Sequence, residues 1–216
     1  MSTTTTTVLG LTKPAYNTEG ELWGGELNGN ADLIDAAIPG VRLLSGTISS
    51  IGDLDLALSS AYTAYQLILT NVTSGASKLF ARFTVSTLQT TGYEYVRTDL
   101  NISGPTQTFD TAGGAGAIML SDTMKSQGTD TDNAGMFVID IFSKSTATKG
   151  RIEVYFRGTY QKDQGVSPAQ RVSSEGGGAL LGMSARATAI KIGGFSTLYT
   201  DGIRGSYQLI GIPGLA

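Results

Sequence analysis

Apolar and polar residues alternate with a period of two along most of the chain after residue 43. The clearest examples are KLFARFTVS (78–86), MFVIDIF (136–142) and RIEVYFRGTY (151–160). Such alternation is typical of strands that bury one face and expose the other. The residues expected to face a core are Leu79, Ala81, Phe83, Val85, Phe137, Ile139, Ile141, Ile152, Val154 and Phe156.

Further candidate strands are separated by segments rich in Gly, Ser, Thr and Asp. The strands are YQLILTNV, GYEYVRT, GAIMLS, ATAIKIGG and IRGSYQLIGI, and the turn signals are TSGAS, TTG, TAGGAG, TDTDNAG, SEGGG and IGGF. Roughly eight to ten short strands without helical segments between them predict an all-β protein. The expected fold is an antiparallel β-sandwich of jelly-roll type.

Residues 20–40 follow a helical period instead. Thr18 and Glu21 fit a capping box at the start of this segment. Apolar residues then recur at steps of three and four, on one face of a helix, at Trp23, Leu27, Ala31, Ile34 and Ile38. Glycines within the segment weaken an isolated helix by about 1 kcal/mol each relative to Ala, so its apolar face needs a partner surface. Pro39-Gly40 ends it, which predicts an N-terminal arm and helix at 1–40 and a sandwich domain at 41–216.

The composition agrees with a β-protein and excludes several functions. Only 15% of the 216 residues are charged, whereas Gly occurs 29 times. The chain has no His and no Cys, which excludes Ser-His-Asp and Cys-His catalysis, disulfides and ordinary zinc sites. A net charge of −3 argues against nucleic acid as a partner. Membrane insertion is not expected, because no apolar run reaches the length of a membrane span.

No motif for enzymatic chemistry or cofactor binding stands out. The acidic residues fall mostly in predicted turns or on outward strand positions, and no pair is marked as a catalytic pair. The segment DTDN (130–133) resembles the start of a calcium loop, but the Gly and the closing Glu are misplaced. The GGG at 176–178 does not open a helix and so is no phosphate loop. We therefore expect no enzyme activity, no cofactor and no metal.

Four tyrosines are candidates for contact with a ligand or a sister chain. Tyr93 and Tyr95 share one strand face, Tyr155 is expected to point outward, and Tyr199 falls in a late loop. Aromatic faces beside planar polar groups suit carbohydrate, but outward tyrosines also pack subunit interfaces. Both interpretations, receptor contact and trimer contact, remain open at this point.

Two segments resemble proteins of bacteriophage tails. LGLTKPAYNTEGELWGGELNGNADLIDAAI (9–38) is similar to the N-terminal segment of many tail fibre and minor tail proteins. The matching residues are Leu11, Thr12, Lys13, Pro14, Trp23, Gly24, Leu27, Asn28, Asn30, Leu33, Ile34 and Asp35. The strands TAYQLILTNV and IRGSYQLIGI, with Arg82-Phe83 between them, resemble a β-sandwich module appended to such proteins.

The resemblance implies a virion structural protein, made in the host cytoplasm and carried on the phage tail. Its N-terminus would attach to other virion proteins of the tail or baseplate, through Leu11, Lys13, Pro14, Trp23, Leu27, Asn28, Ile34 and Ile38. The sandwich would be displayed, as a homotrimer, to bind a host cell-surface glycan or protein. An alternative is an architectural head fibre, decoration or collar protein without receptor binding. A polysaccharide depolymerase is a third and weaker alternative.

Overall fold

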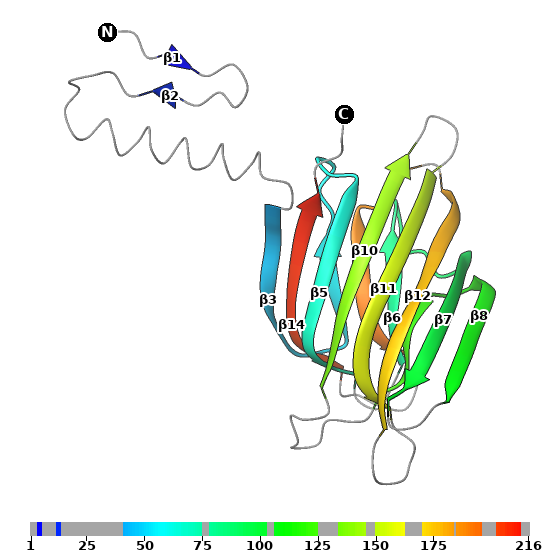
Figure 1. Ribbon diagram of the computed structural model, residues 1–216. Helices are drawn as coiled ribbons and strands as arrows, with labels where there is room; N and C mark the ends of the chain where they lie inside the picture. Colours follow the sequence, from blue (N-terminus) through cyan, green and yellow to red (C-terminus); the bar gives the residue numbers. More distant parts are fainter. Residues whose placement is uncertain are drawn as a thin grey trace. The chain divides into compact units, whose positions relative to one another are not determined.

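The computed structural model describes Thr4–Thr5, Thr12–Lys13, 41–74, 78–102, 106–124, 134–145, 150–162, 170–183, 185–195 and 202–212 (Figure 1). The chain divides into two units, Met1–Val41 and Arg42–Ala216. In the first unit, β1 (Thr4–Thr5) pairs antiparallel with β2 (Thr12–Lys13). The helix predicted between Trp23 and Ile38 lies outside the described residues.

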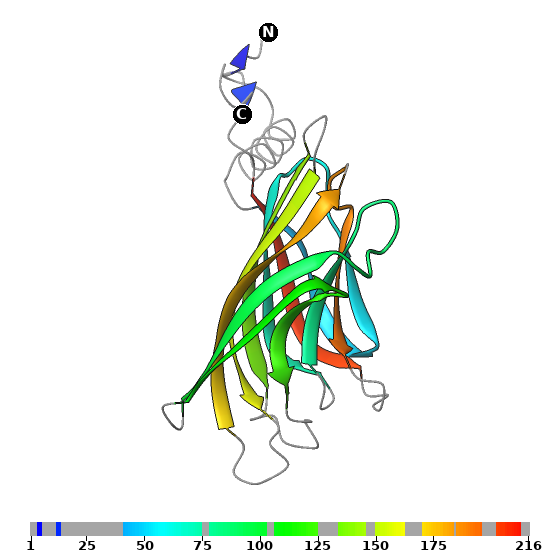
Figure 2. The same cartoon turned by 90° about the vertical axis from the view of Figure 1, so that its right-hand side faces the viewer.

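The second unit consists of two antiparallel sheets, which confirms the all-β prediction. The larger sheet contains, in spatial order, β3 (Val41–Ile51), β14 (Ile203–Ile212), β5 (Ala64–Thr73), β10 (Gly135–Ser145), β11 (Gly150–Lys162), β12 (Gln170–Met183), β7 (Tyr93–Asn101) and β8 (Gln107–Ala115). The smaller contains β4 (Asp53–Ala57), β13 (Ala189–Phe195), β6 (Lys78–Thr84) and β9 (Ile118–Thr123). Figure 2, turned by 90°, shows the two sheets as layers.

The core lies between the two layers and is filled from both sides. The larger sheet contributes Leu67, Ile139 and Val154, all fully buried, and the smaller contributes Phe83 and Ile190. The inward alternation predicted for 137–141 and 152–156 is therefore confirmed. Within 79–83, Leu79, Ala81 and Phe83 are buried as predicted. Phe80, expected on the opposite face, is buried as well, and the Arg82 guanidinium covers its ring at 4.7 Å.

Three glycine-rich segments predicted to be turns are strands instead. SEGGG lies in the middle of β12, the glycines of IGGF lie in β13, and most of TAGGAG belongs to β8. Close approach explains the first two cases. A Cβ on Gly176 would collide with the Val96 carbonyl oxygen and the Phe156 ring, and one on Gly193 would collide with Asp53. These glycines allow dense packing between strands and do not mark chain reversals.

The order of strands gives the larger sheet two parts. One half consists of β3, β14, β5 and β10. Each of these strands directly precedes or follows, along the chain, a strand of the smaller sheet. The other half consists of the hairpins β11–β12 and β7–β8, whose members pair with each other and with no strand of the smaller sheet. The described residues include no helix long and apolar enough to cross a membrane.

Candidate binding groove on the outer face of the large sheet

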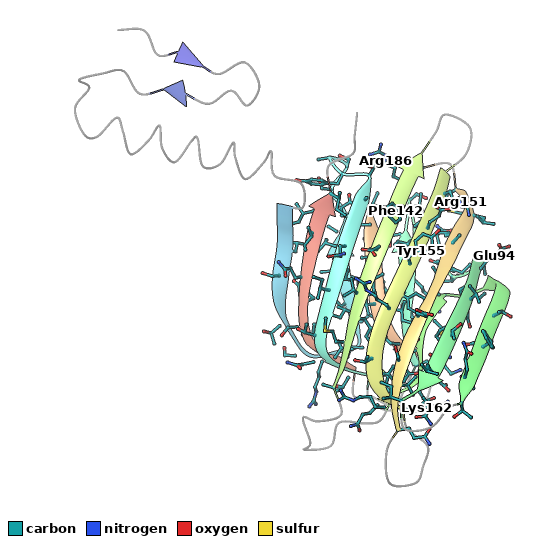
Figure 3. The ribbon with its side chains drawn as sticks, in the orientation of Figure 1. Glu94, Phe142, Arg151, Tyr155, Lys162 and Arg186 are labelled. Atoms are coloured by element: carbon teal, nitrogen blue, oxygen red, sulfur yellow. The ribbon has the colours of Figure 1, made fainter. Side chains whose placement is uncertain are left out.

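The face of the larger sheet that points away from the core carries most of the exposed large apolar side chains. These are Val96, Leu100, Phe109, Met136, Phe142, Tyr155 and Leu181, each at an outward position of its strand. Side chains of this kind scattered singly need no explanation, but a gathering on one face indicates an interaction surface. Figure 3 shows Glu94, Phe142, Arg151 and Tyr155 on this face.

A trough runs along the middle of β12, where the outward positions Gly177 and Ala179 hold small residues. Strand pairing places Tyr155 of β11, Gly177 of β12 and Val96 of β7 in one row across the sheet. Since adjacent strands lie ~4.8 Å apart, the Tyr155 and Val96 side chains rise roughly 10 Å from each other with no side chain between them. A Cβ added to Gly177 would lie 3.3 Å from Cδ1 of Tyr155, so the ring stands directly beside the floor.

Two hollows occupy this trough, one on each side of the Gly177 row. One has a volume of about 450 Å³ and extends toward Glu94 and Arg151. The other has a volume of about 490 Å³ and extends toward Asp140 and Arg157. We call the combined depression the outer groove. The lining residues at outward strand positions are Glu94, Val96, Thr98, Asp140, Arg151, Glu153, Tyr155, Arg157, Glu175, Gly177 and Ala179.

Tyr155 is the main aromatic group of the outer groove. It is 57% exposed, and its ring meets the Phe142 ring edge to face, with centroids 6.2 Å apart and planes at 77°. This contact supports the ring from the β10 side. Tyr155 therefore offers an aromatic surface to a ligand without being buried in the core.

Charged groups of both signs surround the aromatic ring. Arg151 Nε lies 2.7 Å from Glu153 Oε1 on the same strand, and Gln66 Nε2 donates to Asp140 Oδ1 at 2.8 Å. Arg157 and Glu175 face each other in register on β11 and β12. The other lining carboxylate is Glu94. Four carboxylates thus outnumber two guanidinium groups, and the groove has acidic character.

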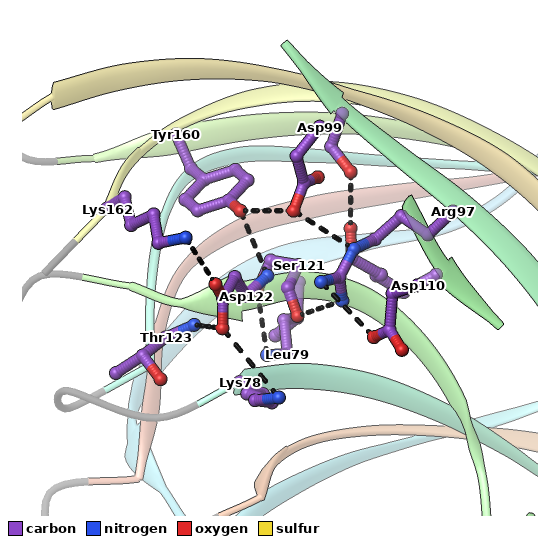
Figure 4. Close-up of polar contacts among 12 residues, drawn as sticks. Lys78, Leu79, Arg97, Asp99, Asp110, Ser121, Asp122, Thr123, Tyr160 and Lys162 are labelled. Atoms are coloured by element: carbon purple, nitrogen blue, oxygen red, sulfur yellow. Dashed lines mark hydrogen bonds and ion pairs between the residues drawn. The ribbon is translucent and has the colours of Figure 1, made fainter. Parts of the chain in front are cut away.

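A second polar cluster lies inside the sandwich, on the opposite face of the same strands (Figure 4). Arg97 is almost fully buried, and its Nη1 donates to the Ser121 carbonyl oxygen at 2.6 Å. Its Nη2 lies 3.3 Å from Asp110 Oδ2 and its Nε lies 3.1 Å from Asp99 Oδ2. The last pair lacks hydrogen-bond geometry, so its attraction is mainly Coulombic. The cluster holds the β7–β8 hairpin onto β9 of the smaller sheet.

Neighbouring groups extend this cluster to the end of β11. The Tyr160 hydroxyl donates to Asp99 Oδ2 at 3.3 Å and accepts from the Asp122 amide at 2.9 Å. Burial, followed by the Asp99 charge, raises the pKa of Tyr160 well above its usual value. Burial alone would raise the pKa of Asp122, but hydrogen bonds from Lys162 and the Thr123 amide, with the charge of Lys78, lower it below the usual value. These groups are bonded to one another within the protein, which fits a structural role.

The predicted tyrosine contacts have different outcomes. Tyr155 lies in the outer groove, as an outward residue. Tyr93 is fully buried, so the prediction that it forms a surface contact is wrong. Its hydroxyl accepts from the Phe83 amide at 2.7 Å and donates to the Gln89 carbonyl oxygen at 3.2 Å. Tyr95 is half-buried on the same inward face and donates to Asp110 Oδ2 at 3.3 Å. Tyr199 lies outside the described residues.

The predicted attachment residues stay predictions. Lys13 belongs to β2, and the remaining seven lie outside the described residues, namely Leu11, Pro14, Trp23, Leu27, Asn28, Ile34 and Ile38. Among the residues that the structure describes, no group of three or more Asp or Glu side chains is placed to hold a metal ion.

Sequence reasoning missed the glycine floor of the outer groove. Gly177 was part of a predicted turn, and nothing in the local sequence indicates that it stands between Tyr155 and Val96. That arrangement depends on the register of three strands that are far apart in the chain. The outward Arg157 was expected from alternation, but its position opposite Glu175 was not.

Comparison with known proteins gives little further information. No protein-family model matches the chain, and no curated protein matches it either. Among solved structures, the chain is similar to one described as the structure of the Clostridium perfringens CspB protease, with 11% sequence identity and a TM-score of 0.23. The similarity covers 79% of this chain and 25% of that chain. Agreement at this level indicates neither a shared fold nor a shared function.

Proposed function

We propose that this chain is a structural protein of a bacteriophage virion, a tail fibre or tail-tip protein that binds the host surface. In this proposal, residues 1–40 attach to other virion proteins and the sandwich is displayed. The motif from Leu11 to Asp35 supports the attachment role by its resemblance to tail fibre and minor tail proteins. The observation that carries the display role is the concentration of exposed apolar side chains and the outer groove on one face of the sandwich.

We also propose that the sandwich is a jelly roll enlarged by two hairpins. Without β7–β8 and β11–β12, the two sheets have the orders β3-β14-β5-β10 and β4-β13-β6-β9. When these eight strands are taken in chain order, the first (β3) pairs with the eighth (β14) and the second (β4) with the seventh (β13). The third (β5) pairs with the sixth (β10) and the fourth (β6) with the fifth (β9), as in a doubled Greek key. This nesting supports the finer assignment.

The free edge of the larger sheet favours contact between copies of the chain, as in the proposed homotrimer. β8 ends the sheet, contains neither Lys nor Pro, and is largely exposed on both of its faces. Phe109 on this strand is 69% exposed. Natural proteins usually protect such edges, so a neighbouring copy is a suitable cover. An architectural role without receptor binding is the second candidate function, and this edge is the observation that favours it.

Two measurements on the full chain test the proposed function. Trp23→Ala should reduce incorporation into tail precursors that lack the protein, while the melting temperature changes little, because an interface Trp contributes about 2 to 4 kcal/mol to docking and not to folding. Fluorescently labelled full chain should bind host cells. Normal incorporation of the Trp23 variant together with a large fall in melting temperature would refute the attachment role. Absence of cell binding would leave the architectural role in its place.

A further inference from the structure

We propose that the outer groove binds a linear, uncharged polysaccharide, with a sugar ring packed against Tyr155. This inference rests on the proposed function, since it names the chemical class of the host-surface ligand. Three features of the described residues carry it: an exposed aromatic ring beside a glycine floor, an open trough along a strand, and an acidic rim with planar polar groups.

The first feature matches the two-sided chemistry of a sugar ring. A pyranose presents C–H groups on its faces and hydroxyl groups around its edge, so it fits an aromatic face that is bordered by hydrogen-bonding side chains. Tyr155 supplies the aromatic face, and Gly177 leaves the space beside it unfilled. Phe142 supports the ring from the far side, so the ring needs little ordering when a ligand binds.

The second feature indicates that the ligand is a polymer and not a single small molecule. Outward positions along a strand repeat every ~7 Å, so the floor from Glu175 through Gly177 to Ala179 extends for roughly 14 Å. The two hollows, of about 450 and 490 Å³, share Val96, Tyr155 and Gly177 and so form one continuous trough. Sites for isolated small molecules usually enclose most of the ligand surface. An elongated, open site therefore suits consecutive units of a polymer better.

The third feature selects the charge of the polymer. Glu94, Asp140, Glu153 and Glu175 outnumber Arg151 and Arg157 around the outer groove. A polyanion, such as a chain of uronic or sialic acids, would place its carboxylates against these groups, and like charges brought together oppose binding. A neutral chain meets no such repulsion. Carboxylates accept hydrogen bonds from sugar hydroxyls and guanidinium groups donate to them.

Arg157 and Glu175 are well placed for hydroxyl contacts. They are cross-strand neighbours on the outer face, and the ion pairs found among the described residues do not include one between them. Both are exposed. A ligand hydroxyl can therefore bind to either group without first breaking an ion pair, which would otherwise reduce the gain from the new hydrogen bond.

Affinity electrophoresis of the full chain tests the inference. Native gels would contain one neutral polysaccharide each, namely dextran, a β-glucan, mannan, galactan or soluble chitin oligosaccharides, and parallel gels would contain alginate or polygalacturonate. We expect retardation by at least one neutral polymer and by neither acidic polymer. Tyr155→Ala should weaken the retardation at least tenfold, whereas Tyr155→Phe, which keeps the ring, should retain most of it. Met136→Ala is the matched control, because this apolar side chain of β10 is also exposed on the outer face but lies outside the outer groove and away from the free β8 edge.

Three results would overturn the inference. They are retardation by no neutral polymer, equal retardation by the acidic polymers, and equal losses in the Tyr155→Ala and Met136→Ala variants. A smaller oligomer in Tyr155→Ala, measured by sedimentation velocity, would instead show that a second copy covers the groove, which also excludes the inference. Cell binding by Tyr155→Ala separates the two proposals. If the variant binds host cells normally while the inference fails, the host-binding function stands and its ligand lies elsewhere on the protein.

Discussion

Replacing Arg97 by Ala should destabilise the sandwich more than any single change on the outer face. The Arg97 side chain is 4% exposed and lies near two carboxylates, at 3.1 Å from Asp99 and 3.3 Å from Asp110. It also donates to the Ser121 carbonyl oxygen. Removing it leaves the Asp99 side chain, only 5% exposed, with a single hydrogen bond, from Tyr160. Removing one partner of a buried ion pair costs about 3 to 5 kcal/mol, because the other charge stays buried.

Urea denaturation followed by circular dichroism measures this loss. Because domains of this kind are stable by about 5 to 15 kcal/mol, the variant should show a clearly lower midpoint. Arg157→Ala is the control, since this side chain is exposed on the other face of the sheet, and it should change the free energy of unfolding by less than about 0.5 kcal/mol.

A double variant tests the reason for the effect. Arg97→Met combined with Asp99→Leu removes both charges and fills the space with apolar groups, so it should recover most of the lost stability. The reasoning would be refuted if Arg97→Ala lost no more than Arg157→Ala. It would also be refuted if the double variant were as unstable as the two single changes added together.

Three further predictions concern the packing and the pH dependence of the sandwich. Gly176→Ala should cost about 1 to 3 kcal/mol by overpacking, whereas Gly113→Ala, which meets no atom within 4 Å, should be nearly neutral in the same urea assay. Phe83→Ala should cost about 3 to 5 kcal/mol, and Arg82→Ala clearly less; equal losses would refute the assigned faces. The lowered pKa of Asp122 stabilises the fold above its unfolded pKa of about 3.9 and ceases to do so as pH falls through the folded value. Asp122→Asn should therefore flatten the fall in melting temperature below about pH 4, and an unchanged acid limb would contradict this.

Alternation in the sequence predicted the strands whose two faces differ in polarity. Ile152, Val154 and Phe156 are buried and Tyr155 is exposed, because one face of β11 meets the core and the other does not. The connectivity of the two sheets cannot be read from such patterns, since pairing partners such as β3 and β14 lie at opposite ends of the domain.

Prediction failed where inward positions are polar or lack a side chain. On β7, the inward face carries Tyr93, Tyr95, Arg97 and Asp99. Because these side chains are polar or charged, the sequence pattern is that of a solvent-exposed strand face. Its polar groups are tolerated because they bond to one another and to β9. The glycine segments of β12 and β13 were mispredicted for a different reason, because glycine usually indicates a turn, whereas Gly176 and Gly193 permit close approach of neighbouring atoms.

In the two hairpins β7–β8 and β11–β12, strand alternation separates inward positions, which must stay constant, from outward positions, which can change. Apart from Asp140, the outward side chains of the outer groove come from β7, β11 and β12, none of which pairs with the smaller sheet. Substitutions at these outward positions alter the proposed ligand surface without altering the core. Under the proposed host-binding function, a lineage could diversify the outward positions of 93–115 and 150–183 while conserving the inward positions and the remaining strands. Under the proposed function, exchange of the two hairpins between relatives would transfer recognition as a unit, provided that β9 of the recipient keeps the groups that bind Arg97 and Tyr160, at Ser121 and Asp122.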